Sequence, residues 1–282
     1  MMTICYLNNE FINLADAKIS VMDRGFLFGD GAYELVSVYR RRFFQWSWHI
    51  ERLGRSLCEI RLSVDLTPLQ KAAQKLIELN DKADLSLYIQ ITRGAEKVRR
   101  HAFGDDIKPT VFMVAWPRPP VAEEKVLNGV SCLTMEDFRW QRGDIKSTSL
   151  LAAVLIADDT AKVGAEDTIL LRDGKVTEGA SSNVIIVINE RLITPVADNR
   201  LLRGITYQMA LAVAGDLGLA TEERDITRGE LAAADEIWLA SSTREIMPVV
   251  ELDGQAVGDG QPGAIFGRVR AAFVQLIGGN EQ

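Results

Sequence analysis

The chain has 282 residues, of which 47% are hydrophobic and 25% are charged, an ordinary composition for a soluble globular protein. The net charge of −7 argues against a general nucleic-acid binder, because such proteins need a basic surface. The three cysteines are scattered and show neither metal-ligand spacing nor a disulfide framework, so we expect no metal site.

Two further features of the sequence concern location. The apolar run 150–157 is far too short to cross a bilayer, which takes about 20 residues. The first residues lack the basic start and long apolar core of a signal peptide. We therefore expect a cytoplasmic protein without a membrane partner.

The first predicted elements are a hairpin and a strand. Residues 3–7 and 10–13 form the hairpin around two asparagines. A glycine-rich run, 23–34, then leads into a strand that ends near Tyr39. The glycines match neither a phosphate-binding P-loop nor a dinucleotide fingerprint, so a closely packed loop is the simplest interpretation.

Two helices and two strands follow. Apolar residues at helical spacing predict a helix capped by Ser47, and Thr67 followed by Pro68 predicts the start of another. Residues 85–92 and 110–116 are expected to be strands, and a polar loop, 94–108, joins them.

The proline cluster 117–120 is the clearest linker signal, because such clusters are stiff and cannot join a sheet. We expect a small N-terminal domain over 1–117, a linker over 118–121 and a larger domain over 122–282. Hairpins dominate, which predicts an α+β fold with largely antiparallel sheets and flanking helices. The second domain should contain strands near 130–134 and 236–240, helices near 150–163, from 205 and over 263–277, hairpins turning at 173–174 and 189–190, and a capping box at Thr227 and Glu230.

Two polar breaks in the second part of the chain are candidates for a site. In the first, Lys146 lies just before an apolar helix. In the second, Glu178 precedes the small residues 179–182, which allow the backbone to approach a bound group closely. On residue types alone, a solvated surface position is the commoner outcome for a lysine or a glutamate.

Three runs in order along the chain strongly resemble the class IV aminotransferases, the fold-type IV pyridoxal phosphate (PLP) enzymes. They are Asp-Ile-Lys-Ser at 144–147, Thr-Glu-Gly-Ala-Ser-Ser-Asn at 177–183 and Leu-Arg-Gly-Ile-Thr at 202–206. The glycine-rich run 23–34 is also similar to one in this family. The resemblance covers nearly the whole chain and is closest to the D-amino acid aminotransferases. It implies the two-domain fold-type IV architecture and PLP as the cofactor.

The resemblance implies a role for each candidate. Lys146 would bind the cofactor covalently and move the proton at the substrate α-carbon, for which its amine must lose its charge. Glu178 would hold the pyridine nitrogen in its protonated form. A helix that begins at Ile205 would direct its backbone N–H groups at the phosphate, with a hydroxyl from Thr206 and a guanidinium from Arg52. Further cofactor contacts are expected from Ser182, Ser241 and Ser242.

Substrate binding is predicted at Tyr33, Arg99 and His101. Alternate side chains of an extended segment face the same way, so Arg99 and His101 are expected to point together while Arg100 faces elsewhere. A basic loop tip in water is the alternative interpretation. The resemblance implies that this pair grips the substrate α-carboxylate with Tyr33, and that the loop reaches into the partner subunit of a homodimer. D-Alanine and similar D-amino acids would then be donors, and a 2-oxo acid such as 2-oxoglutarate the acceptor.

Other activities on the same scaffold stay open. Branched-chain L-amino acid aminotransferase, aminodeoxychorismate lyase and (R)-amine transaminase are the alternatives. A binding protein that has lost the chemistry is another, although Lys146 and Glu178 are retained. The family prefers an aromatic residue where Ile185 stands and often a basic one where Tyr207 stands, which weakens the subfamily assignment more than the cofactor assignment.

Overall fold

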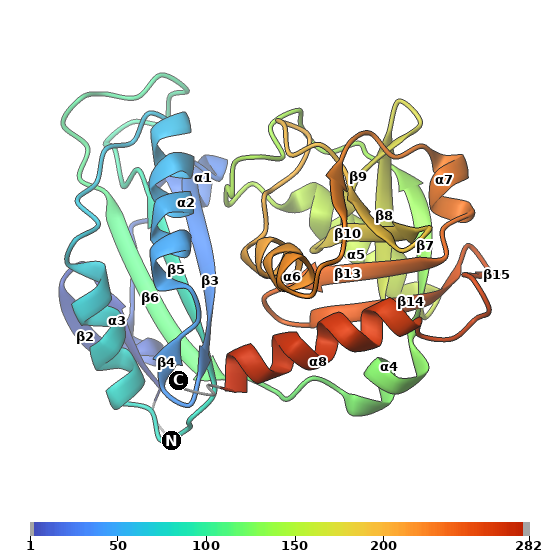
Figure 1. Ribbon diagram of the computed structural model, residues 1–282. Helices are drawn as coiled ribbons and strands as arrows, with labels where there is room; N and C mark the ends of the chain where they lie inside the picture. Colours follow the sequence, from blue (N-terminus) through green and yellow to red (C-terminus); the bar gives the residue numbers. More distant parts are fainter. Residues whose placement is uncertain (1–2, 279–282) are drawn as a thin grey trace. The chain divides into compact units, whose positions relative to one another are not determined.

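The computed structural model describes residues 3–278, which form two compact units. The first comprises the chain up to Pro119 together with Ile145–Leu150, and the second comprises Pro120–Asp144 and the chain from Leu151 onward. The fold is α+β, with largely antiparallel sheets and flanking helices, as predicted. Figure 1 shows the helices and strands of both units.

The first unit is built on an antiparallel sheet with the strand order β2-β1-β6-β5-β3-β4. Helix α2 packs against β3, and α3 packs against β1 and β6. Leu85, Leu87, Ile89 and Ile91 alternate along β5 and are fully buried in the core that these helices share with the sheet. The elements are β1 (Ile4–Leu7), β2 (Glu10–Asn13), a 3-10 turn (Leu14–Asp16), α1 (Arg24–Phe28), β3 (Gly31–Tyr39), β4 (Arg42–Phe43), α2 (Trp46–Glu59), α3 (Leu69–Glu78), β5 (Leu85–Thr92) and β6 (Thr110–Pro117).

The second unit contains a larger mixed sheet with the strand order β12-β11-β10-β13-β14-β7-β8-β9, and β15 pairs with β14. Its parallel pairs are β11 with β12, β14 with β7 and β7 with β8. Helix α6 packs against α8 and against β13 and β14. The elements are α4 (Glu123–Asn128), β7 (Val130–Glu136), α5 (Leu151–Lys162), β8 (Asp167–Arg172), β9 (Lys175–Gly179), β10 (Asn183–Ile188), β11 (Arg191–Thr194), α6 (Ile205–Asp216), β12 (Thr221–Glu223), α7 (Arg228–Ala232), β13 (Glu236–Ser241), β14 (Glu245–Leu252), β15 (Gln255–Ala256) and α8 (Ala264–Gly278).

The predicted position of Lys146 in the C-terminal domain needs correction. The segment Ile145–Leu150 belongs to the first unit, because it bonds to the backbone at the start of β3. The Tyr33 N–H donates to the Lys146 carbonyl at 3.0 Å, and the Thr148 N–H donates to the Gly31 carbonyl at 3.0 Å. A short stretch after the linker therefore returns to the N-terminal sheet, which spacing along the sequence did not reveal.

The starts of the first two long helices also differ from the prediction. Gln45, in the left-handed conformation, precedes α2, so Ser47 lies inside the helix and is not its cap. Pro68 occupies the cap position of α3, and the Thr67 hydroxyl donates to Asp65 at 2.8 Å instead. The capping box of Thr227 and Glu230 is present as predicted. Among residues 3–278, no helix is long and apolar enough to span a membrane.

Candidate active site

Lys146 is held on two sides within the first unit. Its carbonyl accepts from β3, and its own N–H donates to the Ser56 hydroxyl of α2 at 3.2 Å. The Lys146 Nζ lies 4.3 Å from the centre of the Tyr33 ring, close enough for a cation–π contact. The structure thus places the predicted catalytic amine against one of the predicted substrate-binding side chains.

Near this lysine segment, β3 and α2 share a buried ionic cluster. Glu34 accepts from the Arg52 Nε at 2.7 Å and from the Arg52 Nη2 at 2.8 Å, while the His49 Nδ1 lies 2.7 Å from the same carboxylate. Burial alone would raise the pKa of Glu34, but the charge and hydrogen bonds of Arg52 outweigh it and hold the pKa at about 2. Burial is also the main reason that the pKa of His49 lies below its ordinary value. Glu34 is therefore an anion between a cation and an imidazole with a lowered pKa.

This cluster changes the expectation for Arg52. The bidentate edge of its guanidinium is bound by Glu34, so a phosphate contact would have to use the N–H groups outside that edge. Sequence reasoning missed Glu34, although a signal existed. A glutamate two residues from the apolar Ala32 and Val36 on one strand faces the core, where a carboxylate needs partners.

The polar loop between β5 and β6 carries Arg99 and His101. The Arg99 guanidinium lies 4.8 Å from the centre of the Phe28 ring, and the His101 ring centre lies 5.5 Å from it. The side chain of Arg100 turns instead to Glu96, at 3.0 Å. Arg99 and His101 are thus brought to a single aromatic ring of α1, and both side chains are exposed.

In the second unit, Glu178 lies at the end of β9 and is buried. Its Oε1 accepts from the Arg139 Nη1 at 2.7 Å, and its Oε2 accepts from the Leu202 N–H at 3.0 Å and from the Asn183 Nδ2 at 3.4 Å. Arg139 also binds Asp137 through its Nε and Nη2. Burial alone would lower the pKa of Arg139, but the two carboxylates together keep it above its ordinary value. A permanent cation thus balances the charge of Glu178, and sequence reasoning did not identify it.

The N-terminus of α6 is tied to Glu178 through Asn183. The Asn183 Nδ2 donates to the Leu202 carbonyl at 2.7 Å, just ahead of the helix. A Cβ at Gly204 would lie 2.0 Å from the Asn183 Oδ1, so only glycine fits beside this amide. Gly204 caps α6 without a side-chain hydrogen bond, and Ile205 and Thr206 in the first turn are buried. The backbone at the start of α6 therefore lies close to the Asn183 side chain. The N-terminus of a helix suits an anionic group such as the phosphate of PLP.

The serines predicted to contact the cofactor have partners within the protein. The Ser182 hydroxyl donates to Asp167 at 2.7 Å, and the Ser241 hydroxyl accepts the Arg244 N–H at 3.2 Å. The Arg244 side chain binds Asp167 at 2.9 Å and the Ser181 hydroxyl at 2.5 Å. The Ser182 hydroxyl thus shapes the turn after Glu178, while Ser241 and Ser242 lie half-buried at the end of β13.

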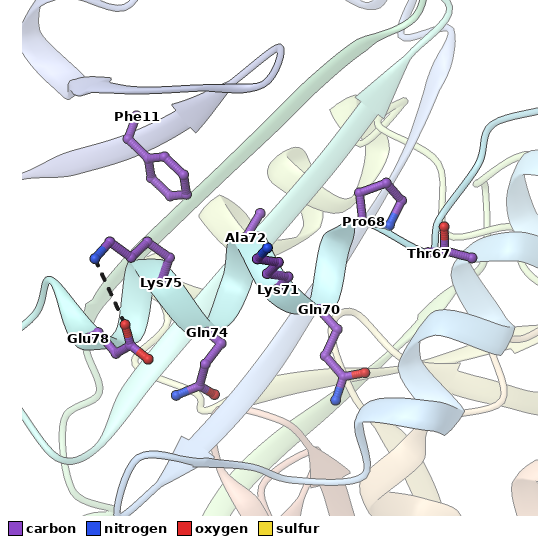
Figure 2. A pocket seen from close by; sticks show the side chains of 9 residues that line it. All are labelled: Phe11, Thr67, Pro68, Gln70, Lys71, Ala72, Gln74, Lys75 and Glu78. Atoms are coloured by element: carbon purple, nitrogen blue, oxygen red, sulfur yellow. Dashed lines mark ion pairs between the residues drawn. The ribbon is translucent and has the colours of Figure 1, made fainter.

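The first unit also has a surface hollow that is lined by none of the predicted site residues. Figure 2 shows Phe11 of β2 beside α3, whose Lys71, Lys75 and Glu78 line the same hollow. Lys75 and Glu78 are separated by 4.0 Å and both are exposed. This surface contains none of the residues predicted to bind cofactor or substrate.

Comparison with known proteins identifies the family. The sequence profile of the family described as Amino-transferase class IV matches residues 31–252. The chain is 37% identical over 273 residues to a D-alanine aminotransferase of Bacillus licheniformis, covering 96% of this chain and 95% of the relative. It is 38% identical over 281 residues to a D-alanine aminotransferase of Staphylococcus epidermidis, covering 98% of each chain.

Solved structures show the same fold. The branched-chain amino acid aminotransferase of Escherichia coli superposes with a TM-score of 0.90 at 25% identity, covering 98% of this chain and 95% of that one. The match to the family profile extends over most of the chain, and the D-alanine aminotransferases match it over nearly their full length. The chain therefore belongs to the class IV aminotransferases and is a pyridoxal-phosphate-dependent enzyme.

Proposed function

We propose that this enzyme transfers the amino group of D-alanine and similar D-amino acids to a 2-oxo acid such as 2-oxoglutarate. The observation that carries the proposal is the placement of Arg99 and His101 on one ring of α1, exposed and adjacent. An arginine fork and an imidazole donor suit a carboxylate, which amino acids and 2-oxo acids have in common. The similarity to two D-alanine aminotransferases supports the stereochemical part.

Each candidate residue has a part in this proposal. When bound, PLP supplies an aldehyde carbon for the amino group and a ring that withdraws electrons from the substrate α-carbon. The Lys146 Nζ holds the cofactor and then takes and returns the proton at the α-carbon. Glu178 holds a proton at the pyridine nitrogen, and Arg139 keeps the Glu178 carboxylate in place from its other side.

Phosphate binding is assigned to the first turn of α6, with Ile205 and Thr206, and to Ser241, Ser242 and Arg52. The glycine at the start of α6 supports this assignment, because a side chain there would collide with Asn183. Ser182 is assigned a supporting role through Asp167.

Substrate binding is assigned to Tyr33 and to the loop that carries Arg99 and His101. We propose that the enzyme is a homodimer in which this loop reaches the substrate of the partner subunit. The exposure of both side chains is consistent with a contact beyond their own subunit.

A branched-chain L-amino acid aminotransferase is the second candidate, and the structural similarity to the Escherichia coli enzyme favours it. Aminodeoxychorismate lyase and (R)-amine transaminase are weaker alternatives, because their assignment rests on the shared scaffold alone.

The substrate assignment is tested by the double variant Arg99→Ala with His101→Ala. We expect the KM for D-alanine to rise by about tenfold or more, since the carboxylate loses the fork of Arg99 and the imidazole donor of His101. The visible spectrum of bound cofactor should not change. Lys97→Ala is the matched control, because it removes a positive charge from an exposed side chain of the same loop. An unchanged KM in the double variant would contradict the proposal.

A further inference from the structure

One buried arginine holds the loop that carries Arg99 and His101. Arg24, the first residue of α1, is 4% exposed. Its Nη1 donates to the Arg100 carbonyl at 2.8 Å, and its Nη2 donates to the His101 carbonyl at 2.9 Å. Two consecutive peptide groups of the loop are thus fixed by a single side chain.

The same guanidinium is fixed by two carboxylates. The Arg24 Nε donates to Asp30 at 2.8 Å, and the Nη1 donates to Glu96 at 2.8 Å. Four acceptors are therefore arranged around one planar group, a geometry that the fork of arginine can satisfy and a lysine ammonium cannot. Glu96 also accepts from the Arg100 side chain and from the Gly104 N–H, so it holds the loop at two further points.

Helix α1 supplies the surface on which the two loop side chains rest. The guanidinium carbons of Arg24 and Arg99 lie 4.9 Å and 4.8 Å from the centre of the Phe28 ring, and the His101 ring also contacts it. The backbone anchor and the aromatic platform therefore come from one short helix. Together they set the direction in which Arg99 and His101 project.

The contacts of Arg24 extend through Asp30 and Arg93 to the end of α2. Asp30 binds Arg93 through both oxygens, at 2.8 and 3.0 Å, and Arg93 donates to the Ile60 and Arg61 carbonyls after α2. The loop is thus connected through Arg24, Asp30 and Arg93 to the turn that ends α2. Binding groups held by such a support lose less conformational freedom when they bind a ligand.

We propose that Arg24 is a positioning residue for carboxylate recognition: it preorganises the loop so that Arg99 and His101 present their donors together. This inference rests on the proposed function, in which that pair holds the α-carboxylate. Arg24 itself is buried beneath the loop and acts through the loop backbone. Its loss should therefore weaken the binding of amino acid and 2-oxo acid alike, and leave cofactor binding unchanged.

The test compares Arg24→Lys with Arg55→Lys, an exposed position on α2, in the holoenzyme. Arg24→Lys keeps the charge and loses the fork. We expect it to raise the KM for D-alanine and for 2-oxoglutarate by about tenfold, the scale of one charge-assisted hydrogen bond, with kcat changed far less. In a half-reaction with D-alaninamide, which lacks the carboxylate, the variant and the wild type should react at similar rates. Arg55→Lys should match the wild type throughout.

A double-mutant cycle shows whether Arg24 acts through the pair. In the background of Arg99→Ala with His101→Ala, the further change Arg24→Lys should have little additional effect on KM. Limited trypsin digestion gives a structural measurement, because cleavage after Lys97, Arg99 and Arg100 should be faster in Arg24→Lys than in the wild type. If Arg24→Lys does not fold, Glu96→Gln takes its place, since Glu96 binds the same guanidinium and the same loop.

The KM values of these variants distinguish failure of the role of Arg24 from failure of the proposed function. If the pair variant raises the KM for D-alanine while Arg24→Lys and Glu96→Gln leave it unchanged, the role of Arg24 is refuted and the proposed function stands. The role of Arg24 is also refuted if Arg24→Lys raises the KM as much in the Arg99→Ala, His101→Ala background as in the wild type. Arg24 would then act by a route other than these two side chains. If the pair variant leaves the KM unchanged, both proposals fail.

Discussion

Glu178 is the residue that we propose as the partner of the pyridine nitrogen. It is buried, and three donors fix its two oxygens: a guanidinium, a backbone N–H and a side-chain amide. A carboxylate on the surface would turn freely between solvent-exposed positions, whereas this one has a single orientation. Such a fixed charge can stabilise a proton on a ring nitrogen without rearranging during the reaction.

Replacing Glu178 with glutamine keeps the shape of the side chain and removes its charge. We expect Glu178→Gln to retain bound cofactor but to slow the single-turnover half-reaction by about a hundredfold, because an amide does not hold the proton on the pyridine nitrogen by charge. Stopped-flow absorbance of the cofactor measures this rate, and Glu124→Gln on the exposed α4 serves as the control. A variant with the wild-type rate would show that Glu178 is structural.

The pairing of Arg52 with Glu34 could not be predicted from residue types. A guanidinium three residues after a histidine on a helix is a reasonable phosphate ligand, and the sequence shows that the two share a face. The sequence does not show that Glu34, eighteen residues earlier, binds the bidentate edge of Arg52 in the core. Pairing across elements depends on strand register and helix docking, which local pattern does not determine.

The start of α6 is the element on which cofactor binding is expected to depend most. Gly204 has φ −70°, so its backbone is open to any residue, and the restriction is the contact with Asn183. Asn183 in turn holds the Leu202 carbonyl and approaches Glu178. A methyl group at Gly204 would therefore disturb the helix start and the neighbourhood of the carboxylate together.

We expect Gly204→Ala to weaken PLP binding by about tenfold or more, because the Asn183 side chain must break its hydrogen bonds to make room. Cofactor titration of the apoenzyme measures the affinity. Gly215→Ala near the other end of α6 is the matched control, since a Cβ there meets no atom within 4 Å. That control should keep its affinity and gain about 0.5–1 kcal/mol in stability from helix propensity. Equal affinities for the two variants would remove the start of α6 from the cofactor site.

Helix α1 was not predicted at all. Five residues, two of them phenylalanines, carry too little periodic signal for a helix. Its ends are nevertheless specified, since the Asp23 side chain accepts the Gly25 N–H at 2.8 Å and Gly29 ends it at φ 66°. Strands with a clear apolar alternation and helices with a long stripe were predicted to within a residue or two, because burial alone determines their pattern.

In the whole molecule, one segment belongs to a different unit from the one that its place in the sequence predicts. The proline cluster predicted a boundary near 118–121, yet Ile145–Leu150 lies with the first unit. These residues pair with the first residues of β3, where Thr148 also donates its hydroxyl to the Gly29 carbonyl at 2.9 Å. Such a return of the chain is a tertiary arrangement, and neither composition nor periodicity predicts it.

Short motifs were the source of the predictions for the reacting groups. Lys146 and Glu178 were predicted from short runs similar to the family, and their roles in the reaction stay predictions. Arg139, which binds Glu178, was not, because nothing in its local sequence distinguishes it. Asn183 and Arg24 lie within runs similar to the family, but those runs do not reveal that Asn183 binds the Leu202 carbonyl or that Arg24 binds the Arg100 carbonyl. Positioning residues are defined by the partners that the fold brings to them, and those partners lie far away in the chain.

The substrate and its stereochemistry are tested by a half-reaction of the purified holoenzyme with paired enantiomers, followed through the absorbance of the bound cofactor. D-Alanine, L-alanine, L-leucine and L-valine are each supplied without an acceptor, and the single-turnover rate is recorded. We expect rapid conversion with D-alanine and far slower conversion with the L-amino acids. Rapid transfer from L-leucine or L-valine, with no reaction of D-alanine, would contradict it and establish the branched-chain assignment.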